Sequence, residues 1–456
     1  MKLRASAVLA VAVMLWIGAA GSAQRLGFAI PRGPLAGPPG STPRPGDPLP
    51  GLTPREFTEF RLGLDDFLEV ETAEEGLGPA FNATSCAVCH NVPAVGGMST
   101  ILEARIGRRD ALGGFLPVDG TGETLVHLFS IPTHGCQPAI PPEATVIARR
   151  APIPVFGAGL VELIPDEDLL ALEDPADANG DGVSGRAARF IDPVTSALRV
   201  GRFGWKAQHT SLLTFGADAY RNEMGITNDI FPREFAFGIT DEAMRRCDRI
   251  RDPEDIRDRR TGRRGIDNFA SFMRLLAPIA RGTIDAEAAA GEAVFETAGC
   301  AACHVPTHRT GPSENPLFNR QLVPAFSDFL LHDVGTGDGI VQAAAGANEI
   351  RTPALWGLRV RRPLLHDGRA ATIEDAILAH GQEAYARKPL EWPQKARQSA
   401  LRPSLCFRLR RAVTSPVSRG SRSGFVFAPG SAPSPGKMPC VPWHRQAHGS
   451  ARPPDS

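Results

Sequence analysis

The pattern Cys-x-x-Cys-His occurs twice in the sequence, at residues 86–90 and at residues 300–304. In each copy, two thiols can bond to the two vinyl groups of a porphyrin, and the following histidine can place a ring nitrogen on the iron. A zinc site would need a second pair of ligands, and neither copy has another cysteine pair nearby. The sequence therefore predicts two covalently attached c-type haems. The attachment residues are Cys86, Cys89, Cys300 and Cys303, with His90 and His304 as proximal iron ligands.

An oxygen-rich segment at residues 177–182 (DANGDG) resembles the first half of a calcium-binding loop. Asp177, Asn179 and Asp181 offer side-chain oxygens at alternate positions, which suits a hard cation. The pattern departs from an EF-hand because Ala188 stands at the twelfth position, where a bidentate Glu belongs. An ordinary turn rich in Asp and Asn also fits. We predict a calcium site and keep the turn as the alternative.

Four cysteines lie outside the two haem patterns. Cys136 and Cys247 fall in the middle of the chain, where either a structural disulfide or two separate thiols fits. The disulfide is the simpler interpretation in an oxidising compartment. Cys406 and Cys440 lie near the C-terminus and receive no role.

The N-terminus is typical of a secretory signal peptide. Two basic residues precede an apolar run over residues 5–20, and small residues up to Ala23 form a cleavage pattern. The alternative, a membrane anchor, is disfavoured because a span needs about 20 apolar residues. No later stretch reaches spanning length. We therefore predict an exported protein without a stable membrane span, which in a Gram-negative cell is periplasmic.

The charge of the chain is unevenly distributed. Fifty Lys and Arg balance fifty Asp and Glu overall, which argues against a nucleic-acid-binding protein. From Ala386 to the end, however, thirteen basic residues face two acidic ones. This segment is rich in Pro, Arg and Ser and has no apolar periodicity, so it cannot form a packed core. We interpret it as a disordered tail or a translated frameshift; binding to an acidic partner is the third interpretation.

A helix is predicted before each haem pattern. Thr53 and Pro54 form a helix start before the first, and the Ala-rich residues 285–298 form a helix before the second. A late helix is expected at 373–380, and short strands or loops at 153–164.

The 456 residues allow two or three domains. We predict a mainly α fold with long loops and minor β structure. Its parts are a signal peptide (1–23), a Pro/Gly-rich lead-in (24–52), an N-terminal cytochrome c-like haem domain with the calcium loop (53–250), a C-terminal cytochrome c-like haem domain (265–388) and the basic tail (389–456).

Six short segments together make the chain resemble a known family. They occur in the expected order between about residue 54 and about residue 386. They resemble the bacterial di-haem oxidoreductases known as thiol oxidoreductases and, more distantly, the di-haem cytochrome c peroxidases. The segments are 81–85 (FNATS), 91–97 (NVPAVGG), 156–162 (FGAGLVE), 202–208 (RFGWKAQ), 223–228 (EMGITN) and 364–368 (LLHDG).

The resemblance implies roles for two residues between the haem patterns. In the peroxidase relatives one haem stores electrons, the other meets peroxide, a Trp lies between them, and a calcium ion lies near their interface. Trp205 is in the segment that resembles the one with the bridging Trp, and Glu223 resembles the Glu that transfers protons at the peroxide site. The alternatives are core packing for Trp205 and a surface carboxylate for Glu223.

The distal iron ligands are the least determined part of the site. In such peroxidases a Met often precedes the His-Asp-Gly sequence, whereas this chain has Leu365 there. A lone histidine is more often a hydrogen-bonded structural residue than a ligand. The candidates are His366, His332 and Met224, with His209, His127 and Met98 for the first haem.

These features predict an exported di-haem oxidoreductase. One haem would receive electrons from a small periplasmic cytochrome or cupredoxin, and the other would act on a small molecule, with peroxide favoured. The alternative is an electron-transfer cytochrome with two six-coordinate irons, although such a carrier needs far less chain. Thiol oxidation ranks lower, because no residues mark a thiol site, and a haem-dependent oxygenase that acts on a polymer is a further alternative on a related scaffold.

Overall fold

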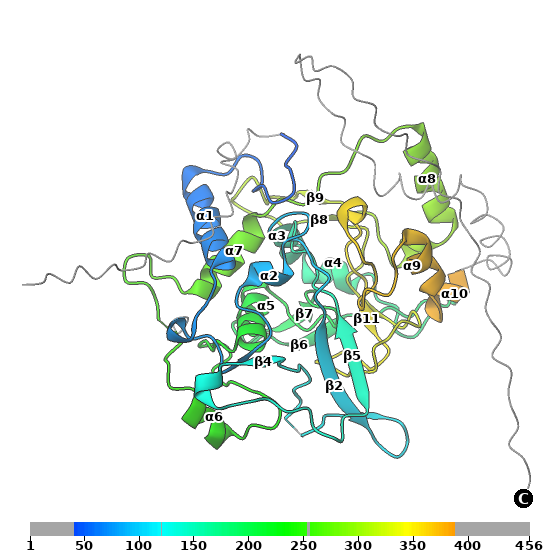
Figure 1. Ribbon diagram of the computed structural model, residues 1–456. Helices are drawn as coiled ribbons and strands as arrows, with labels where there is room; N and C mark the ends of the chain where they lie inside the picture. Colours follow the sequence, from blue (N-terminus) through cyan, green and yellow to red (C-terminus); the bar gives the residue numbers. More distant parts are fainter. Residues whose placement is uncertain (1–40, 120, 253–255, 388–456) are drawn as a thin grey trace, which may run out of the picture. The chain divides into compact units, whose positions relative to one another are not determined.

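The computed structural model describes residues 41–119, 121–252 and 256–387 (Figure 1). The predicted signal peptide, most of the lead-in and the basic tail with Cys406 and Cys440 lie outside the described residues. The described part of the chain contains no helix with the length and apolar character needed to cross a membrane.

Helices hold more residues than strands, and long irregular segments join them, which confirms the predicted fold class in this coarse form. The α-helices are α1 (Pro54–Leu68), α2 (Cys86–Cys89), α3 (Ala158–Glu162), α4 (Asp166–Leu170), α5 (Leu212–Ala219), α6 (Asp241–Cys247), α7 (Gly265–Leu275), α8 (Ala286–Thr297), α9 (Ile373–Ala379) and α10 (Glu383–Arg387). Short 3-10 or π helices are η1 (Ala73–Glu75), η2 (Pro132–His134), η3 (Tyr220–Met224), η5 (Cys300–Ala302) and η6 (Leu358–Val360). The strands are β1 (Ala80–Phe81), β2 (Glu103–Arg109), β3 (Phe115–Leu116), β4 (Phe129–Ser130), β5 (Val146–Arg150), β6 (Ala188–Ile191), β7 (Leu198–Gly201), β8 (His308–Arg309), β9 (Leu322–Val323), β10 (Leu331–His332) and β11 (Ile350–Arg351).

Helix α1 starts where the sequence predicts. The Thr53 side chain accepts a hydrogen bond from the Glu56 backbone N–H, and the Glu56 carboxylate accepts one from the Thr53 backbone N–H, so both bonds of the capping box are made. Its buried residues Phe60, Leu64 and Phe67 recur at helical spacing and face the core. The Ala-rich helix and the late helix also form, as α8 and α9. The expectation of strand or loop at 153–164 is wrong in part, because its buried apolar residues form the short α3.

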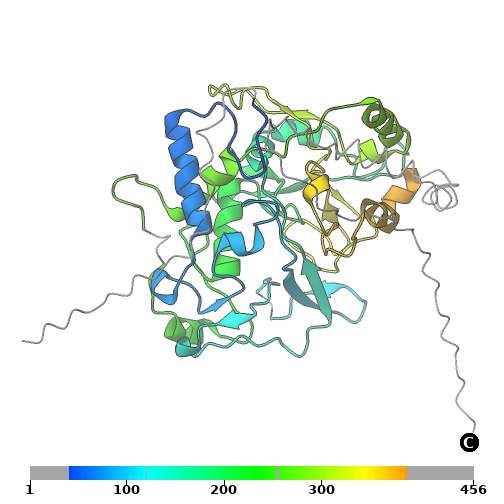
Figure 2. The ribbon, with the colours of Figure 1, turned by 45° about the horizontal axis from the view of Figure 1, so that its top comes forward.

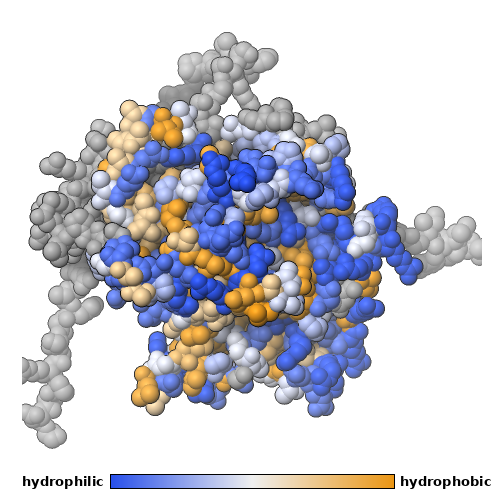
Figure 3. Space-filling model, turned by 180° about the vertical axis from the view of Figure 1, so that it is seen from behind, coloured by the Kyte–Doolittle hydropathy of each residue, from blue (hydrophilic) through white to orange (hydrophobic). Residues whose placement is uncertain are grey.

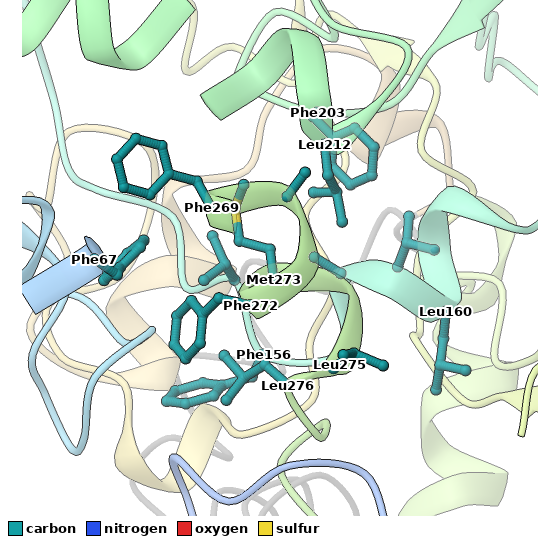
Figure 4. Packing of buried hydrophobic residues seen from close by; sticks show 14 of the residues in the cluster. Phe67, Phe156, Leu160, Phe203, Leu212, Phe269, Phe272, Met273, Leu275 and Leu276 are labelled. Atoms are coloured by element: carbon teal, nitrogen blue, oxygen red, sulfur yellow. The ribbon is translucent and has the colours of Figure 1, made fainter. Parts of the chain in front are cut away.

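The centre of the core is the contact between α1 and α7 (Figures 1 and 2). The Phe272 ring lies 5.4 Å from that of Phe60 and 4.8 Å from that of Phe67. The helices approach closely at Gly63, where an added Cβ would lie 2.1 Å from the Asn268 carbonyl oxygen. Figure 4 shows how side chains from α1, α3, α5 and α7 fill this region.

This packing bears on the predicted domain boundary. Helix α7 opens the predicted C-terminal domain, yet it packs against α1, α3 and α5, which belong to the predicted N-terminal domain. Both haem patterns fall within one compact unit of the chain. The division into two haem domains stays a prediction.

The β structure is limited to small antiparallel units. The largest is a three-stranded sheet in the order β3-β2-β5, with Glu103 opposite Arg150 and Ile106 opposite Ile147. Alternate residues of β5 are buried, and Arg150 is among them. The pleat therefore directs a charged side chain, together with apolar ones, to the interior.

The disulfide prediction is confirmed. Cys136 and Cys247 are bonded, with their Cα atoms 5.9 Å apart. The bond joins the segment after η2 to the last residue of α6.

On the face opposite to the view of Figure 1, polar and apolar residues are interspersed (Figure 3), as is usual for a folded chain.

The close approach of α1 and α7 can be tested with a single methyl group. We expect Gly63→Ala to lower the free energy of unfolding by about 1–3 kcal/mol, because the new Cβ would overlap a backbone carbonyl that cannot rotate away. Gly216→Ala in α5 is the control: its Cβ would meet the flexible end of Met273 at 3.3 Å and the Phe269 Cβ at an ordinary contact distance of 3.6 Å, and alanine favours the helix. Urea unfolding of both variants measures the difference. Equal stability of the two variants would contradict the proposed contact.

Candidate functional site

The first Cys-x-x-Cys-His string is held at the end of α1. The Ser85 hydroxyl accepts a hydrogen bond from the Ala87 backbone, as an N-cap of α2, and lies 3.3 Å from the Phe67 carbonyl oxygen, to which it donates. The His90 backbone N–H closes the turn on the Cys86 carbonyl. The string is thereby fixed to the core helix that precedes it.

The His90 ring is oriented by a backbone carbonyl. Its Nδ1 lies 2.8 Å from the Gly97 oxygen, and because a carbonyl only accepts, Nδ1 must carry the proton. The other nitrogen, Nε2, is then the one able to bind iron. Gly97 lies in a tight loop in which an added Cβ would be 2.0 Å from the Val92 carbonyl oxygen, so the loop requires a small residue there. Burial lowers the pKa of His90, which favours the neutral form that a metal needs.

The second string repeats this arrangement with different surroundings. The His304 Nδ1 donates to the Phe326 carbonyl at 2.9 Å, and burial lowers the pKa of His304 to about 4. Phe326 has a φ of 54°, a conformation that costs a non-glycine residue on the order of 1–3 kcal/mol. Two sequence-distant segments thus hold chemically equivalent histidines, and both fit proximal iron ligands.

A cavity of about 230 Å³ lies beside the second string. Its wall is mostly apolar and includes Trp205, two buried arginines and residues of α8, α9 and the segment before α9. A large apolar cleft next to two cysteines and a neutral histidine fits a haem held by the string. The residues that line it include Cys300, Cys303, His304, Trp205, His332, Arg351, Arg361, Leu365 and His380.

Trp205 joins the cavity to the rest of the core. Its side chain is buried, and the indole Nε1–H donates to the Ala151 carbonyl at 2.8 Å. The Arg361 guanidinium lies over the indole, 5.6 Å from the ring centroid, and the His366 ring meets it edge-on at 6.1 Å. Trp205 therefore packs in the interior and also faces the cavity.

The predicted distal ligands near the second string, His332 and His366, contact other side chains. The His332 Nε2 contacts Asp328 at 2.8 Å and its Nδ1 contacts Glu383 at 2.9 Å. Burial opposes a charge on His332, but these carboxylates raise its pKa well above the usual value, and a protonated imidazole cannot bind iron. His366 is buried against Trp205 and is not among the cavity-lining residues, whereas Leu365 is.

One histidine that the sequence reasoning missed does line this cavity. His380 follows α9, and its Nδ1 donates to the Ala376 carbonyl at 2.6 Å. Nε2 is thus the nitrogen suited to a metal, as in His304. Its place at the end of a predicted helix was visible in the sequence, but the side of that helix facing the cavity was not.

The first string has an acidic neighbour in Glu223. This residue lies in the π-helical η3, and the Asn82 side-chain amide donates to its Oε2 at 2.9 Å. Burial, followed by the charge of Glu103, raises the pKa of Glu223 to about 8, so the carboxyl is neutral at pH 7. Burial and then the charges of Glu223 and Glu103 also raise the pKa of the Cys89 thiol to about 12. The Glu223 backbone carbonyl accepts hydrogen bonds from Asn82 at 2.7 Å and Ala83 at 3.2 Å, so Glu223 is held beside the segment that leads into the string.

Glu103 is the second member of this pair, and the sequence reasoning missed it. The Arg105 guanidinium binds it at 2.6 Å and 3.3 Å, and Arg150 approaches to 4.0 Å. Although burial alone would raise its pKa, these cations lower it, so Glu103 is ionised while Glu223 keeps a proton. The pair therefore holds one proton between two carboxyls. The signal in the sequence was the spacing of Glu103 and Arg105, which places both side chains on one face of a strand.

The candidate ligands of the first haem also have other partners. Met224 packs in the main core, and Met98 is buried. The His209 Nε2 contacts Asp218 at 3.1 Å, and the His127 Nε2 donates to the Asn222 carbonyl at 2.8 Å. Iron ligation by any of them stays a prediction.

The calcium loop forms a series of turns. Asp177 accepts from the Gly182 backbone at 2.9 Å, and the side chains of Asn179 and Asp181 accept from the backbone two residues further on. In residues 41–387, apart from the gaps at 120 and 253–255, three side chains of His, Cys, Asp or Glu converge at Cys303, Asp328 and His332, and not at this loop. The calcium site stays a prediction.

A comparison with known families identifies the class of protein. The sequence profile described as "Di-haem oxidoreductase, putative peroxidase" matches residues 141–405, more than half of the chain. The chain belongs to this family of di-haem, peroxidase-like oxidoreductases. The matched range contains the second string, Trp205 and Glu223. No curated protein sequence matches the chain.

Solved structures provide remote likenesses. Hydrazine synthase of Kuenenia stuttgartiensis is 16% identical, with a TM-score of 0.36, over 84% of this chain and 98% of that one. The diheme peroxidase BthA of Burkholderia thailandensis E264 is 15% identical, with a TM-score of 0.35, over 78% and 81% of the two chains. A MauG-like protein associated with microbial copper homeostasis is 16% identical, with a TM-score of 0.27, over 62% and 94%.

The raised pKa of Glu223 has a consequence for stability. The unfolded chain releases this proton near pH 4.3 but the folded chain holds it to about pH 8, so folded-state stability falls as pH rises through this window. Glutamine mimics the protonated acid and cannot ionise. We therefore expect Glu223→Gln to be more stable than the parent at pH 8 by more than about 1 kcal/mol, and equal to it near pH 4.

Urea unfolding at several pH values measures this difference. Glu242→Gln, on the exposed face of α6, is the matched control and should keep the parent profile. Parallel profiles for Glu223→Gln and the parent would show that Glu223 is already ionised at pH 7.

Proposed function

We propose that the chain is an exported c-type di-haem enzyme that reduces hydrogen peroxide at the first string, with electrons delivered through the second. The observation that carries the proposal is the neutral Glu223 carboxyl close to Cys89, because peroxide reduction needs a proton donor at the reacting iron. Haem bound at each string supplies an iron that accepts and releases single electrons. The four string cysteines would hold the two haems, and Nε2 of His90 and of His304 would bind the irons.

The acid pair suits the proton part of this reaction. Reduction of hydrogen peroxide to water consumes protons together with electrons. Glu223 can give its proton to the departing oxygen, and Asn82 fixes the carboxyl that does so. Glu103 stays ionised beside Arg105, and its charge raises the proton affinity of Glu223, so that Glu223 regains a proton from solvent for the next cycle.

Trp205 supports a path between the two sites. Its Nε1–H is bonded to the Ala151 carbonyl, and Ala151 follows Arg150, whose guanidinium reaches toward Glu103 of the first site. The other side of Trp205 faces the cavity of the second string. A small periplasmic cytochrome or cupredoxin is the electron donor that we propose.

Export and calcium binding belong to the proposal as well. Export is supported by the N-terminal sequence pattern, and the disulfide between Cys136 and Cys247 agrees with an oxidising compartment. Calcium at Asp177, Asn179 and Asp181 is supported by the spacing of their oxygens alone.

Optical and EPR spectra test the assignment of the two sites. The haem-loaded chain should show one high-spin haem that binds cyanide, at the first string, and one low-spin haem with His380 as its distal ligand. His380→Ala should convert the low-spin signal to high-spin, whereas His134→Ala, away from both strings, should leave it unchanged. Two low-spin haems that ignore cyanide in every redox state would leave an electron-transfer cytochrome as the function.

Kinetics test the proton donor. Glu223→Gln should lower kcat/KM for hydrogen peroxide by about 10²–10⁴-fold, the usual loss when a general acid is removed. In the parent, activity should fall as pH rises through about 8, since Glu223 must be protonated to act. Glu242→Gln should retain full activity. A Glu223→Gln enzyme with unchanged kcat/KM would remove Glu223 from the reaction.

A further inference from the structure

Two arginines lie buried in the wall of the second cavity. Arg361 follows η6 and is 6% exposed, and Arg351 ends β11 and is 4% exposed. The Arg361 Nε atom is shielded from solvent and has no hydrogen-bond partner. Arg351 donates to two backbone carbonyls, of Gly204 at 2.7 Å and of Thr352 at 2.8 Å. Both guanidinium groups therefore face the cavity without a full set of acceptors.

The charge of this pair is only partly balanced by the chain, through the buried Asp328 carboxylate, which raises the pKa of Arg351. Across the residues that the structure describes, no carboxylate lies within 4.0 Å of either guanidinium. Burial lowers the pKa of Arg351 to about 9 and that of Arg361 to about 10, and the Arg361 charge further disfavours the charged form of Arg351, against the opposing effect of Asp328. Buried uncompensated cations are strongly unfavourable. The cavity is therefore built for an occupant that carries negative charge.

The shape of the cavity indicates what kind of anion this is. Apart from the arginines its wall is mainly apolar, and Cys300, Cys303 and His304 line the same space. The occupant must combine a large apolar body with an anionic edge. A haem has this form, since its carboxylates project from one edge of an apolar ring, and guanidinium groups bind carboxylates through paired hydrogen bonds.

We propose that Arg361 and Arg351 form a carboxylate-binding site for the propionate groups of the haem at the second string, and that Arg361 thereby raises the reduction potential of this haem. The inference rests on the proposed attachment at residues 300–304. A nearby cation favours the reduced iron, which carries less positive charge. Because Arg361 also lies over Trp205, the same guanidinium links the anionic edge of the cofactor to the indole.

Variants of Arg361 in the haem-loaded chain test the proposal. Arg361→Gln removes the charge, and Arg361→Lys keeps the charge but removes the planar pair of donors. Arg362→Gln is the matched control, because it removes the same charge from the next residue, which is exposed and does not line the cavity. For each chain we would measure covalent haem content, the midpoint potential of each haem, and the resonance Raman bands of propionate bending.

We expect Arg361→Gln to keep both haems, to shift the potential of one haem to a more negative value and to shift its propionate band. Arg361→Lys should shift the potential less, and Arg362→Gln should shift neither quantity. Unchanged potential and band in Arg361→Gln would overturn the proposal, and so would an equal shift in Arg362→Gln. A parent potential that depends on added phosphate would show a free anion at the arginines instead, and would also overturn it.

Failure of the underlying function would look different. A parent chain that carries haem at the first string alone would refute the attachment at residues 300–304 before any arginine is changed. If the parent carries both haems and the Arg361 variants do not differ from it, the carboxylate site is refuted while the haem attachment stands.

Discussion

The hydrogen bond from a string histidine to a backbone carbonyl is the interaction on which the rest of this structure depends. It fixes which ring nitrogen of His90 and His304 faces the cofactor side, and each bond needs a carbonyl from a separate stretch of chain. At the first string, that stretch is a loop too tight for a side chain at Gly97. At the second, it is a turn with Phe326 in a left-handed conformation. The close contact of α1 and α7 supports the arrangement at the first string, because the Ser85 hydroxyl before this string is hydrogen-bonded to the Phe67 carbonyl near the end of α1.

A network of buried charges joins β5 to the segments that contain Lys206 and Asp338. Arg150 binds Asp338 at 2.7 Å, and Lys206 binds the other oxygen of the same carboxylate at 3.0 Å. Lys206 follows Trp205 in the chain, and Arg150 also approaches Glu103. Burying such groups is unfavourable unless they are paired, so the network fixes the relative positions of β2, β5 and the segment that contains Asp338. Apolar side chains of similar volume could hold these segments at a lower free-energy cost of burial, but they would leave no charges near the sites. Retention of the network therefore agrees with a redox protein, in which buried charges set potentials and proton affinities.

The two sites differ in the ionisable groups that lie beside them. Near the first string, a pair of carboxyls shares one proton; near the second, two arginines face an apolar cavity. A protonated carboxyl can donate its proton, whereas buried guanidinium groups stabilise an anionic partner. Equivalent sequence strings nevertheless mark both sites. The surroundings of the two strings therefore differ, although the strings themselves are alike.

The amino-acid sequence determined those features that depend on short spacing. The two haem strings, the capped start of α1 at Thr53, the helices before each string and the class of oxidoreductase all follow from residues a few positions apart, because a single turn of chain brings them together. The disulfide was one of two open interpretations until the structure placed Cys136 and Cys247 in contact. Glu103, His380 and the arginine pair could not be found in this way. Their roles arise from contacts between segments that are far apart in sequence, such as Glu103 with Glu223 and Arg361 with Trp205. Burial in the folded chain then shifts their proton affinities, and only the tertiary structure decides which groups are buried together.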